Sequence, residues 1–500
     1  MNLSFLTSLF KKENNVLTDT ESVLIDRLKH IATKNNLLFF ENTTIYHHKK
    51  SFLIPIIIID EKRGIFVFEY KDWSYDDLKN ATIKRASKQN SSSNTLAFEK
   101  AHDSITDRFK EILHNDGVPI FNFLIMENLN TAQYNFLNKS IKEILPINSI
   151  ILNNLEENEI SSLIEKKPLY SSTINKEKIA TTLFAQYAIL KQEEVKLSTK
   201  EQIEFIESTI IGKQILVGDF HTGKSSALVL KIILEKLKNP NIEICVIKPN
   251  KLSCDILKKQ LLDSVEYSIV EVDITPIKIF TPIELINYHL SKLSKEHINE
   301  LFIDNLLMNK KLFIADYLIC DDSQFINNKF LLYLEHIQKN KNLLLIQNIS
   351  DGEQNFQFTK NLDPKELDIH FYQAPQHAKA LQVISTLLKE YKAKDILVIS
   401  TKISKENLQE DLEYFIESDT TLIDSSKKII EHNLDNLLLS TYSDMHSLNI
   451  KHIVLLDICL VSTEELNYAL HIPHKSIHII YEEVCEKIQK IKDDFENREK

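Results

Sequence analysis

Arginine, glycine and long apolar runs are scarce in this 500-residue chain. The scarcity of arginine limits guanidinium chemistry, and the short apolar runs exclude membrane-spanning helices. Only five of the 60 basic residues are arginines, at positions 27, 63, 85, 108 and 498, so none lies between 108 and 498. Lysine cannot replace the planar guanidinium fork, so most of the chain must work without that chemistry. The apolar runs are all shorter than the ~20 residues that a membrane-spanning helix needs. We therefore expect no membrane partner.

The cysteine spacing, the first residues and the net charge argue against a cysteine-ligated metal site, a secretory signal and a protein that coats nucleic acid. Five cysteines occur without any C-x-x-C spacing, which predicts reduced core residues of a cytoplasmic protein, with no zinc or iron–sulfur site. The first residues carry an apolar run followed by Lys11 and Lys12, the reverse of a secretory signal. A net charge of −11 argues against a protein that coats nucleic acid through bulk charge.

Two of the six glycines lie five positions apart in residues 218–225, which read GDFHTGKS. This is the complete G-x-x-x-x-G-K-S pattern, between an apolar strand-like run and a segment with helical spacing. Such a loop wraps phosphates with backbone N–H groups, while Lys224 reaches the terminal phosphates and Ser225 ligates Mg²⁺. The sequence thus predicts an ATP–Mg²⁺ site whose ligands are Gly218, Thr222, Gly223, Lys224, Ser225 and Ser226.

Strand-like and helix-like runs alternate along most of the chain, which predicts an α/β fold with parallel sheets after residue 197. Four segments are expected. They are an N-terminal α/β domain (1–155), a helical connector (156–196), a first lobe with the phosphate loop (197–365), and a second lobe with a C-terminal helix (366–500).

Further motifs resemble a superfamily 1 helicase of the UvrD/Rep type. Residues 197–202 (LSTKEQ) resemble its Q motif, in which Gln202 would recognise adenine, and residues 249–251 (PNK) resemble motif Ia, which touches single-stranded DNA. Residues 317–324 (YLICDDSQ) resemble the D-E-x-Q box. The resemblance implies that Asp321 holds Mg²⁺, that Asp322 orients the attacking water, and that Gln324 senses the γ-phosphate. Asp322 stands where the family has glutamate, one methylene longer.

The second lobe departs from the family pattern. Residues 350–354 weakly resemble motif III, with Gln354 near the nucleotide. Residues 371–374 (FYQA) and 469–473 (ALHIP) resemble the two arginine-bearing motifs, but Gln373 and Ile472 occupy the arginine positions. An arginine finger is worth about 10³–10⁵ in kcat. The resemblance therefore implies two RecA-like P-loop lobes with parallel sheets, able to bind ATP and poor at hydrolysis.

Residues 64–73 (GIFVFEYKDW) resemble the signature of the nuclease-related domain, a branch of the PD-(D/E)xK nucleases with a restriction-endonuclease-like α/β fold. Glu69, as a metal ligand, and Lys71 point to one side of a strand. Glu21 resembles the family's helical glutamate. The second metal-binding acid is missing, because the hairpin predicts Ile56 across from Glu69. The pair is either a weak active site or a remnant on an inactive fold.

Two smaller clusters leave alternatives open. Lys79, Lys84, Arg85 and Lys88 either contact phosphates or belong to a solvated loop. His47 and His48 are not predicted to bind metal, because no acids lie at ligand spacing.

The interpretation that accounts for most of these features is an ATP-binding, helicase-like protein with a nuclease-related domain. It would act on or near DNA with single-stranded regions, in repair or in defence against foreign DNA, with weak hydrolysis and cleavage. One alternative is an active DNA-dependent ATPase or translocase completed by a partner's arginine. The other is a non-catalytic scaffold gated by ATP.

Overall fold

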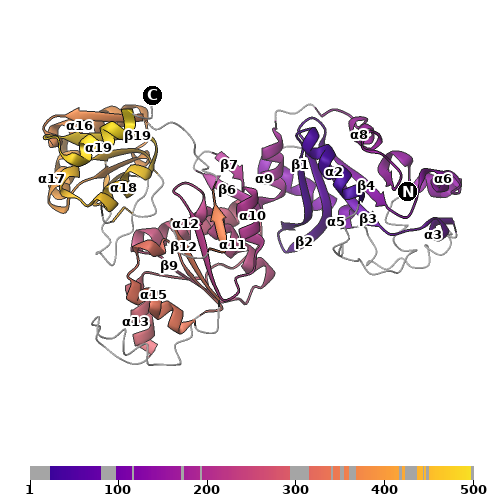
Figure 1. Ribbon diagram of the computed structural model, residues 1–500, viewed down its shortest axis with the longest axis horizontal. Coiled ribbons are helices and arrows are strands. Elements are labelled where there is room, and N and C mark those ends of the chain that lie inside the picture. The colour runs from indigo at the N-terminus through magenta and orange to yellow at the C-terminus, as the bar shows by residue number, and fades with distance from the viewer. Residues whose placement is uncertain are drawn as a thin grey trace. The chain divides into compact units, whose positions relative to one another are not determined.

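The computed structural model describes residues 23–79, 97–114, 117–170, 174–191, 194–292, 315–338, 342–348, 354–359, 368–415, 419–422, 436–442, 444–445 and 450–496. The chain divides into two compact units (Figure 1). Unit 1 comprises residues 1–198 and 263–272, and unit 2 comprises residues 199–262 and 273–500. None of the described helices is long and apolar enough to cross a membrane.

Unit 1 is built on one mixed sheet in which five strands follow each other in chain order. The first three strands are antiparallel and the last two run parallel to the third. The strands are β1 (Leu38–His47), β2 (Lys50–Asp60), β3 (Gly64–Lys71), β4 (Ile120–Met126) and β5 (Ile150–Leu152). A parallel β3–β4 pair needs a crossover, and helix α5 (Ala97–Leu113) supplies it.

Helices cover both faces of this sheet, because its strands alternate two apolar sets of side chains. Helices α2 (Val23–Lys34) and α8 (Glu157–Glu165) share a core with Ile56, Phe66 and Phe68. Helices α5 and α9 (Lys176–Leu183) contact the strands from the other face (Figure 1). The remaining elements of the unit are α3 (Tyr75–Lys79), α6 (Thr131–Asn135), α7 (Lys139–Ile144), β6 (Ala188–Lys191) and β7 (Glu194–Leu197).

The first lobe of unit 2 is a six-stranded parallel sheet in the order β10-β9-β11-β12-β8-β13. Its strands are β8 (Lys213–Gly218), β9 (Ile244–Ile247), β10 (Lys278–Phe280), β11 (Tyr317–Cys320), β12 (Asn342–Gln347) and β13 (Phe356–Phe358). Its helices are α10 (Lys200–Glu207), α11 (Lys224–Lys238), α12 (Lys251–Ser268), α13 (Pro282–Lys292) and α15 (Asn328–Ile337). Every strand runs the same way, so all carboxyl ends meet at one edge of the sheet.

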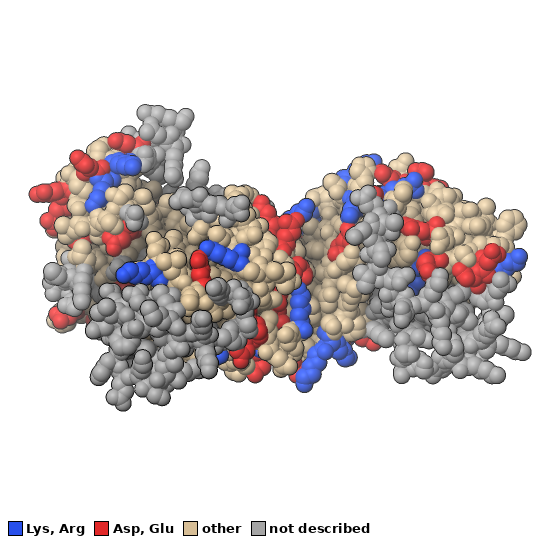
Figure 2. Space-filling model, turned by 60° about the horizontal axis from the view of Figure 1, so that its bottom comes forward, with Lys and Arg blue, Asp and Glu red and all other residues tan. Residues whose placement is uncertain are grey.

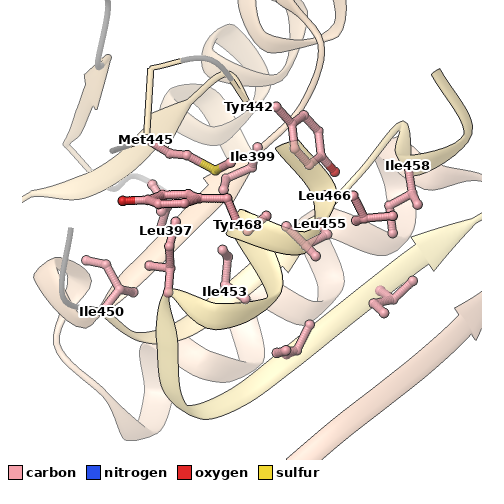
Figure 3. Packing of buried hydrophobic residues seen from close by; sticks show 14 of the residues in the cluster. Leu397, Ile399, Tyr442, Met445, Ile450, Ile453, Leu455, Ile458, Leu466 and Tyr468 are labelled. Carbon is pink, nitrogen blue, oxygen red and sulfur yellow. The ribbon is translucent and has the colours of Figure 1, made fainter. Parts of the chain in front are cut away.

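The second lobe repeats this plan in the order β14-β19-β18-β15-β17-β16, again entirely parallel. Its strands are β14 (Asp368–Gln373), β15 (Ile396–Ile399), β16 (Thr420–Leu422), β17 (Leu437–Ser440), β18 (Ile450–Leu455) and β19 (Pro473–Tyr481). Its helices are α16 (Gln376–Glu390), α17 (Lys402–Phe415), α18 (Thr463–His471) and α19 (Glu486–Glu496). Strands β15, β17 and β18 are buried along their whole length, as expected where helices cover both faces. Figure 3 shows Tyr468 of α18 among Met445, Leu397 and Ile453 in this core.

The mixed α/β class and the two parallel-sheet lobes agree with the prediction from alternating runs. Both lobes contain parallel strands alternating with helices, and β13 lies at the edge of the first sheet beside β8. The helical connector expected over residues 156–196 is only partly helical, because it ends in the antiparallel hairpin β6–β7. Its first strand is mostly apolar, and Ala188 and Ile189 are buried.

The prediction of five reduced core cysteines is wrong for two of them. Cys459 and Cys485 form a disulfide with their Cα atoms 6.0 Å apart, and neither is buried. Cys245, Cys254 and Cys320 are free and buried, as predicted. The error arose because Cys459 follows an apolar strand and looks like part of it, whereas the strand ends at Leu455 and the chain turns outward.

Candidate nucleotide site at the edge of the first lobe

The loop between β8 and α11 needs both of its glycines, for different reasons. A side chain at Gly218 would place its Cβ 2.7 Å from Thr222 Oγ1 and 3.1 Å from the Cβ of Phe358. Gly223 has a φ of 79°, in the left-handed region that glycine adopts without steric cost, and it is the N-cap of α11. The loop therefore closes tightly and delivers the free N–H groups of the α11 N-terminus to its hollow, the arrangement that binds phosphate.

Lys224, Ser225 and Asp321, three of the residues proposed to hold ATP and Mg²⁺, lie together at this edge. The Lys224 ammonium donates to the carbonyl oxygens of Gly218 at 2.6 Å and Asp219 at 2.8 Å. Ser225 Oγ donates to Asp321 Oδ2 at 3.3 Å. Asp321 follows the last residue of β11 and its N–H extends the pairing with β9, so the sheet itself places this carboxylate beside the loop. Ser226 lies in the first turn of α11, partly buried.

The sequence reasoning missed Lys248, which lies at the centre of the site. Its ammonium contacts Asp321 Oδ2 at 2.8 Å and Asp322 Oδ2 at 2.9 Å, and the side chain is only 2 % exposed. Lys248 directly follows β9, the neighbour of β11 in the sheet. Its position beside Asp321 could therefore have been predicted from the sequence. The carboxyl ends of parallel neighbours meet at one edge, and a lysine there must lie beside Asp321.

The pKa values of Lys224 and Lys248 shift in opposite directions. Burial lowers the pKa of Lys224, and the carboxylates of Asp322, Asp321 and Asp219 only partly oppose this. Burial acts in the same direction on Lys248, but its two bonded carboxylates outweigh it and raise the pKa well above the ordinary value. Lys248 is therefore a permanently charged counterion of the acid pair. Lys224 is the cation that remains available to a phosphate.

These residues fit a nucleoside triphosphate and fit a magnesium ion only with a rearrangement. Lys224 and the α11 N-terminus suit a phosphate chain. Ser225 and Asp321 are oxygen donors of the kind that Mg²⁺ prefers. However, Asp321 Oδ2 already accepts from both Ser225 and Lys248. A divalent cation on this carboxylate would have to displace the Lys248 ammonium or share the oxygen with it.

Three other predicted site residues lie around the loop in distinct settings. Gln202 is buried, and its Nε2 donates to Thr222 O at 2.7 Å while its Oε1 accepts from Thr199 N in the α10 cap. Asp322 adopts a left-handed conformation with φ of 57° and starts a short 3₁₀ turn. Gln324 lies in that turn, exposed to solvent. Gln202 is thus part of the loop's support, and its recognition of adenine stays a prediction.

Gln354 is not brought to the phosphate loop. Strand β13 pairs with β8 so that Phe358 lies beside Gly218, which puts Gln354 level with Gln214 at the opposite end of the sheet. Gln354 therefore lies four residues, or about 13 Å along the strand, from the level of Gly218. Gln354 is exposed and donates to Gln357 Oε1 instead. Residues 350–353, the rest of that weak motif, lie outside the described part of the chain.

Neither residue at the expected arginine positions is free to act as a finger. Gln373 ends β14 and donates to Glu482 O at 3.4 Å. Ile472 is buried in the hydrophobic core of the second lobe, so an arginine there would carry its charge into that core. The adjacent His471 meets the phosphate loop instead, because its ring stacks on Phe220 with centroids 4.7 Å apart and its carbonyl contacts His221.

In unit 1, β3 brings Glu69 and Lys71 together as predicted, with the ammonium hydrogen-bonded to Glu69 Oε1. The predicted partner across the hairpin was off by one residue. Ile56 pairs with Phe68, so the position opposite Glu69 is Pro55. A proline supplies no carboxylate and no ladder N–H. Asp60 ends β2 beside the turn, where it accepts from Lys62 N and Arg63.

Several residues singled out in the sequence fall outside the described residues. They are Glu21, Lys84, Arg85 and Lys88.

Comparisons with known proteins find similar folds among solved structures and assign no family to this chain. No family model matches the sequence, and no curated protein matches it. Among solved structures, S. cerevisiae Dbp5 bound to RNA and ADP BeF3 is 9% identical, covering 60% of this chain and 88% of that chain with a TM-score of 0.43. The DEAD-box helicase Mss116 bound to ssRNA and UDP-BeF is 15% identical, covering 61% and 76%, with a TM-score of 0.40. The Escherichia coli DEAH/RHA helicase HrpB is 15% identical, covering 58% and 43%, with a TM-score of 0.38. Scores this low support no argument about activity, which must depend on the residues of this chain.

Proposed function

We propose that the chain binds ATP at the carboxyl edge of the first parallel sheet. The observation that carries this proposal is the buried Lys224 ammonium, held inside a loop closed by Gly218 and Gly223 at the N-terminus of α11. The amide dipoles and the lysine both favour an anion there, and the loop has the length and residue order that cradle a β/γ-phosphate. Calorimetric titration of the full chain with ATP, with and without Mg²⁺, tests this directly.

Slow hydrolysis is the expected consequence of the second lobe. The sequence has no arginine between Arg108 and Arg498, and Gln373 and Ile472 are occupied elsewhere. We expect the purified chain to turn over ATP slowly, with or without single-stranded DNA, in a phosphate-release assay. A DNA-stimulated rate on the order of 10 per second, abolished by Asp322→Ala, would contradict this and favour an active translocase. Strong stimulation by a protein that supplies an arginine would favour the partner-completed enzyme.

The proposed association with DNA rests on the resemblance to helicase motifs, whose residues here make contacts within the chain. Asn250, expected at single-stranded DNA, caps the start of α12 by accepting from Ser253 N, and Lys251 pairs with Glu284 at 3.4 Å. Among the described residues on the face shown in Figure 2, blue and red side chains are interspersed and form no continuous basic stripe. Weak, salt-sensitive binding is therefore what we propose, in keeping with the net charge of −11. An ATP-gated scaffold stays the alternative if DNA changes neither ATP affinity nor turnover.

We also propose that unit 1 has a nuclease-related fold that cleaves nucleic acid poorly. The observation that favours this is the helix–three-strand–helix–strand order with Glu69 and Lys71 paired on the central strand. Lys71 neutralises Glu69, and Pro55 leaves no second acid opposite, so Mg²⁺ would have a single carboxylate against its hydration shell.

The cleavage assay uses linear, nicked and single-stranded DNA with Mg²⁺ or Mn²⁺. We expect no more than trace cleavage, unchanged by Glu69→Gln. Robust cleavage that Glu69→Gln and Lys71→Ala both abolish would show that another acid completes the site.

A further inference from the structure

Two consecutive histidines end the first strand of unit 1, and the fold supplies the acid that the sequence did not show nearby. His47 is the last residue of β1, and His48 begins the tight turn into β2. Glu111 lies 63 residues further along the chain than His48, on α5, and its carboxylate faces both rings. The absence of acids at ligand spacing was the reason for excluding a metal here, and tertiary structure removes that reason.

The backbone holds His48 in an unusual conformation. Its φ is 50°, in the left-handed region that few non-glycine residues adopt. Two hydrogen bonds secure it, because His48 N donates to Ile269 O at 2.9 Å and His48 O accepts from Glu271 N at 3.3 Å. Both partners belong to the same compact unit. The turn thereby aims two neighbouring imidazoles, with centroids 4.4 Å apart, at one carboxylate.

The two imidazole-to-carboxylate separations are close to those between neighbouring ligands of one metal ion. His47 Nε2 lies 3.2 Å from Glu111 Oε2, and His48 Nε2 lies 3.5 Å from Glu111 Oε1. One candidate ligand atom from each residue lies within 4.8 Å of the other two. Bonds of about 2.0–2.1 Å in a tetrahedron put neighbouring ligands about 3.3 Å apart. An ion can therefore enter by replacing the hydrogen bonds, with little movement of the backbone.

The surroundings leave room for the rest of a coordination shell. The three residues line a cavity of about 490 Å³. Asp103, Ser104 and Asp107 line it as well, on the same stripe of α5 as Glu111. His47 is buried, whereas His48 and Glu111 are partly open to solvent. A water can supply a fourth ligand, and a solvated ion can reach the site.

We propose that His47, His48 and Glu111 bind one divalent transition-metal ion in a site of two imidazoles and one carboxylate. This donor set suits Zn²⁺, which takes nitrogen and oxygen ligands in a tetrahedron, rather than Mg²⁺ or Ca²⁺, which prefer all-oxygen shells. The site is separate from the nucleotide site and does not depend on the proposed ATP binding.

The test titrates chelator-treated, full-length protein with Zn²⁺ by calorimetry, and with Co²⁺ by visible absorption, which reports tetrahedral coordination. We expect one ion per chain. His48→Asn removes a ligand and keeps a residue that tolerates positive φ, so the turn should persist. Glu111→Gln removes the charge and keeps the shape. Each change should weaken Zn²⁺ binding more than about tenfold, the lower end of what loss of even an outer-shell partner costs.

His30→Asn is the matched control. His30 Nδ1 lies 2.7 Å from Glu157 Oε2, so it is a histidine–glutamate pair without a second imidazole. Its loss should leave the affinity unchanged. Zn²⁺ binding that survives both His48→Asn and Glu111→Gln, or that His30→Asn weakens equally, would overturn the proposal. So would the absence of one-to-one binding in the parent, or equal affinity for Mg²⁺. Far-ultraviolet circular dichroism without metal confirms that each variant is folded.

Discussion

Replacing Lys224 with alanine is expected to weaken ATP binding about 30-fold or more. The ammonium is buried beside Gly218 O and Asp219 O, inside the loop that would wrap the phosphates. Removing one partner of a desolvated charge pair costs about 2–5 kcal/mol, and 2 kcal/mol already corresponds to that factor. Calorimetric titration of parent and variant with ATP measures it. Thermal shift by saturating ATP gives an independent reading, because a ligand that binds the native state raises its stability.

The control for this experiment lies on the same helix. Lys238 is in the last turn of α11, where its ammonium is 3.5 Å from Glu207 Oε2 near the surface. Lys238→Ala changes the net charge by the same amount and should leave ATP affinity unchanged. If Lys224→Ala binds ATP as tightly as the parent, the loop is not the nucleotide site.

Replacing Lys248 with methionine is expected to destabilise the first lobe strongly. Lys248 is the buried counterion of Asp321 and Asp322, and methionine keeps most of its volume without the charge. Breaking a buried pair by removing one partner costs about 3–5 kcal/mol, because the remaining charge is left uncompensated. Chemical denaturation of parent and variant measures this loss. Mg²⁺ should recover part of it, because a divalent cation can take the vacated place between the carboxylates.

Lys251→Met serves as the comparison, because it removes a lysine three residues away that is part of a more exposed ion pair with Glu284. Exposed pairs contribute about 0–1 kcal/mol, so this variant should be nearly as stable as the parent. Equal stability of Lys248→Met and the parent would show that the acid pair does not need its lysine. Destabilisation that Mg²⁺ leaves untouched would show that the pair accepts no divalent cation.

The motif at residues 218–225 and its flanking runs were enough to predict a strand, a tight loop and a helix in this order, because each of these preferences acts between residues close in sequence. Gly223 needs its left-handed conformation and Lys224 and Ser225 follow it at fixed offsets along one helix. The parallel strands were predictable for a similar reason, since strands buried on both faces must be apolar throughout. Where side chains met along one strand, as with Glu69 and Lys71, alternation sufficed.

What the sequence could not decide depended on registers and on distant partners. A shift of one residue in the β2–β3 hairpin put Pro55, and not Ile56, opposite Glu69. The pairing of β13 with β8 carried Gln354 away from the nucleotide loop. Lys248 reached the acid pair across 73 residues of chain, and Glu111 reached the two histidines from another element. Local pattern determines which segments become strands, helices and phosphate loops, because those preferences act between near neighbours. Only packing decides which side chains share a charge or a ligand, because the sheet order brings together ends that the chain keeps far apart.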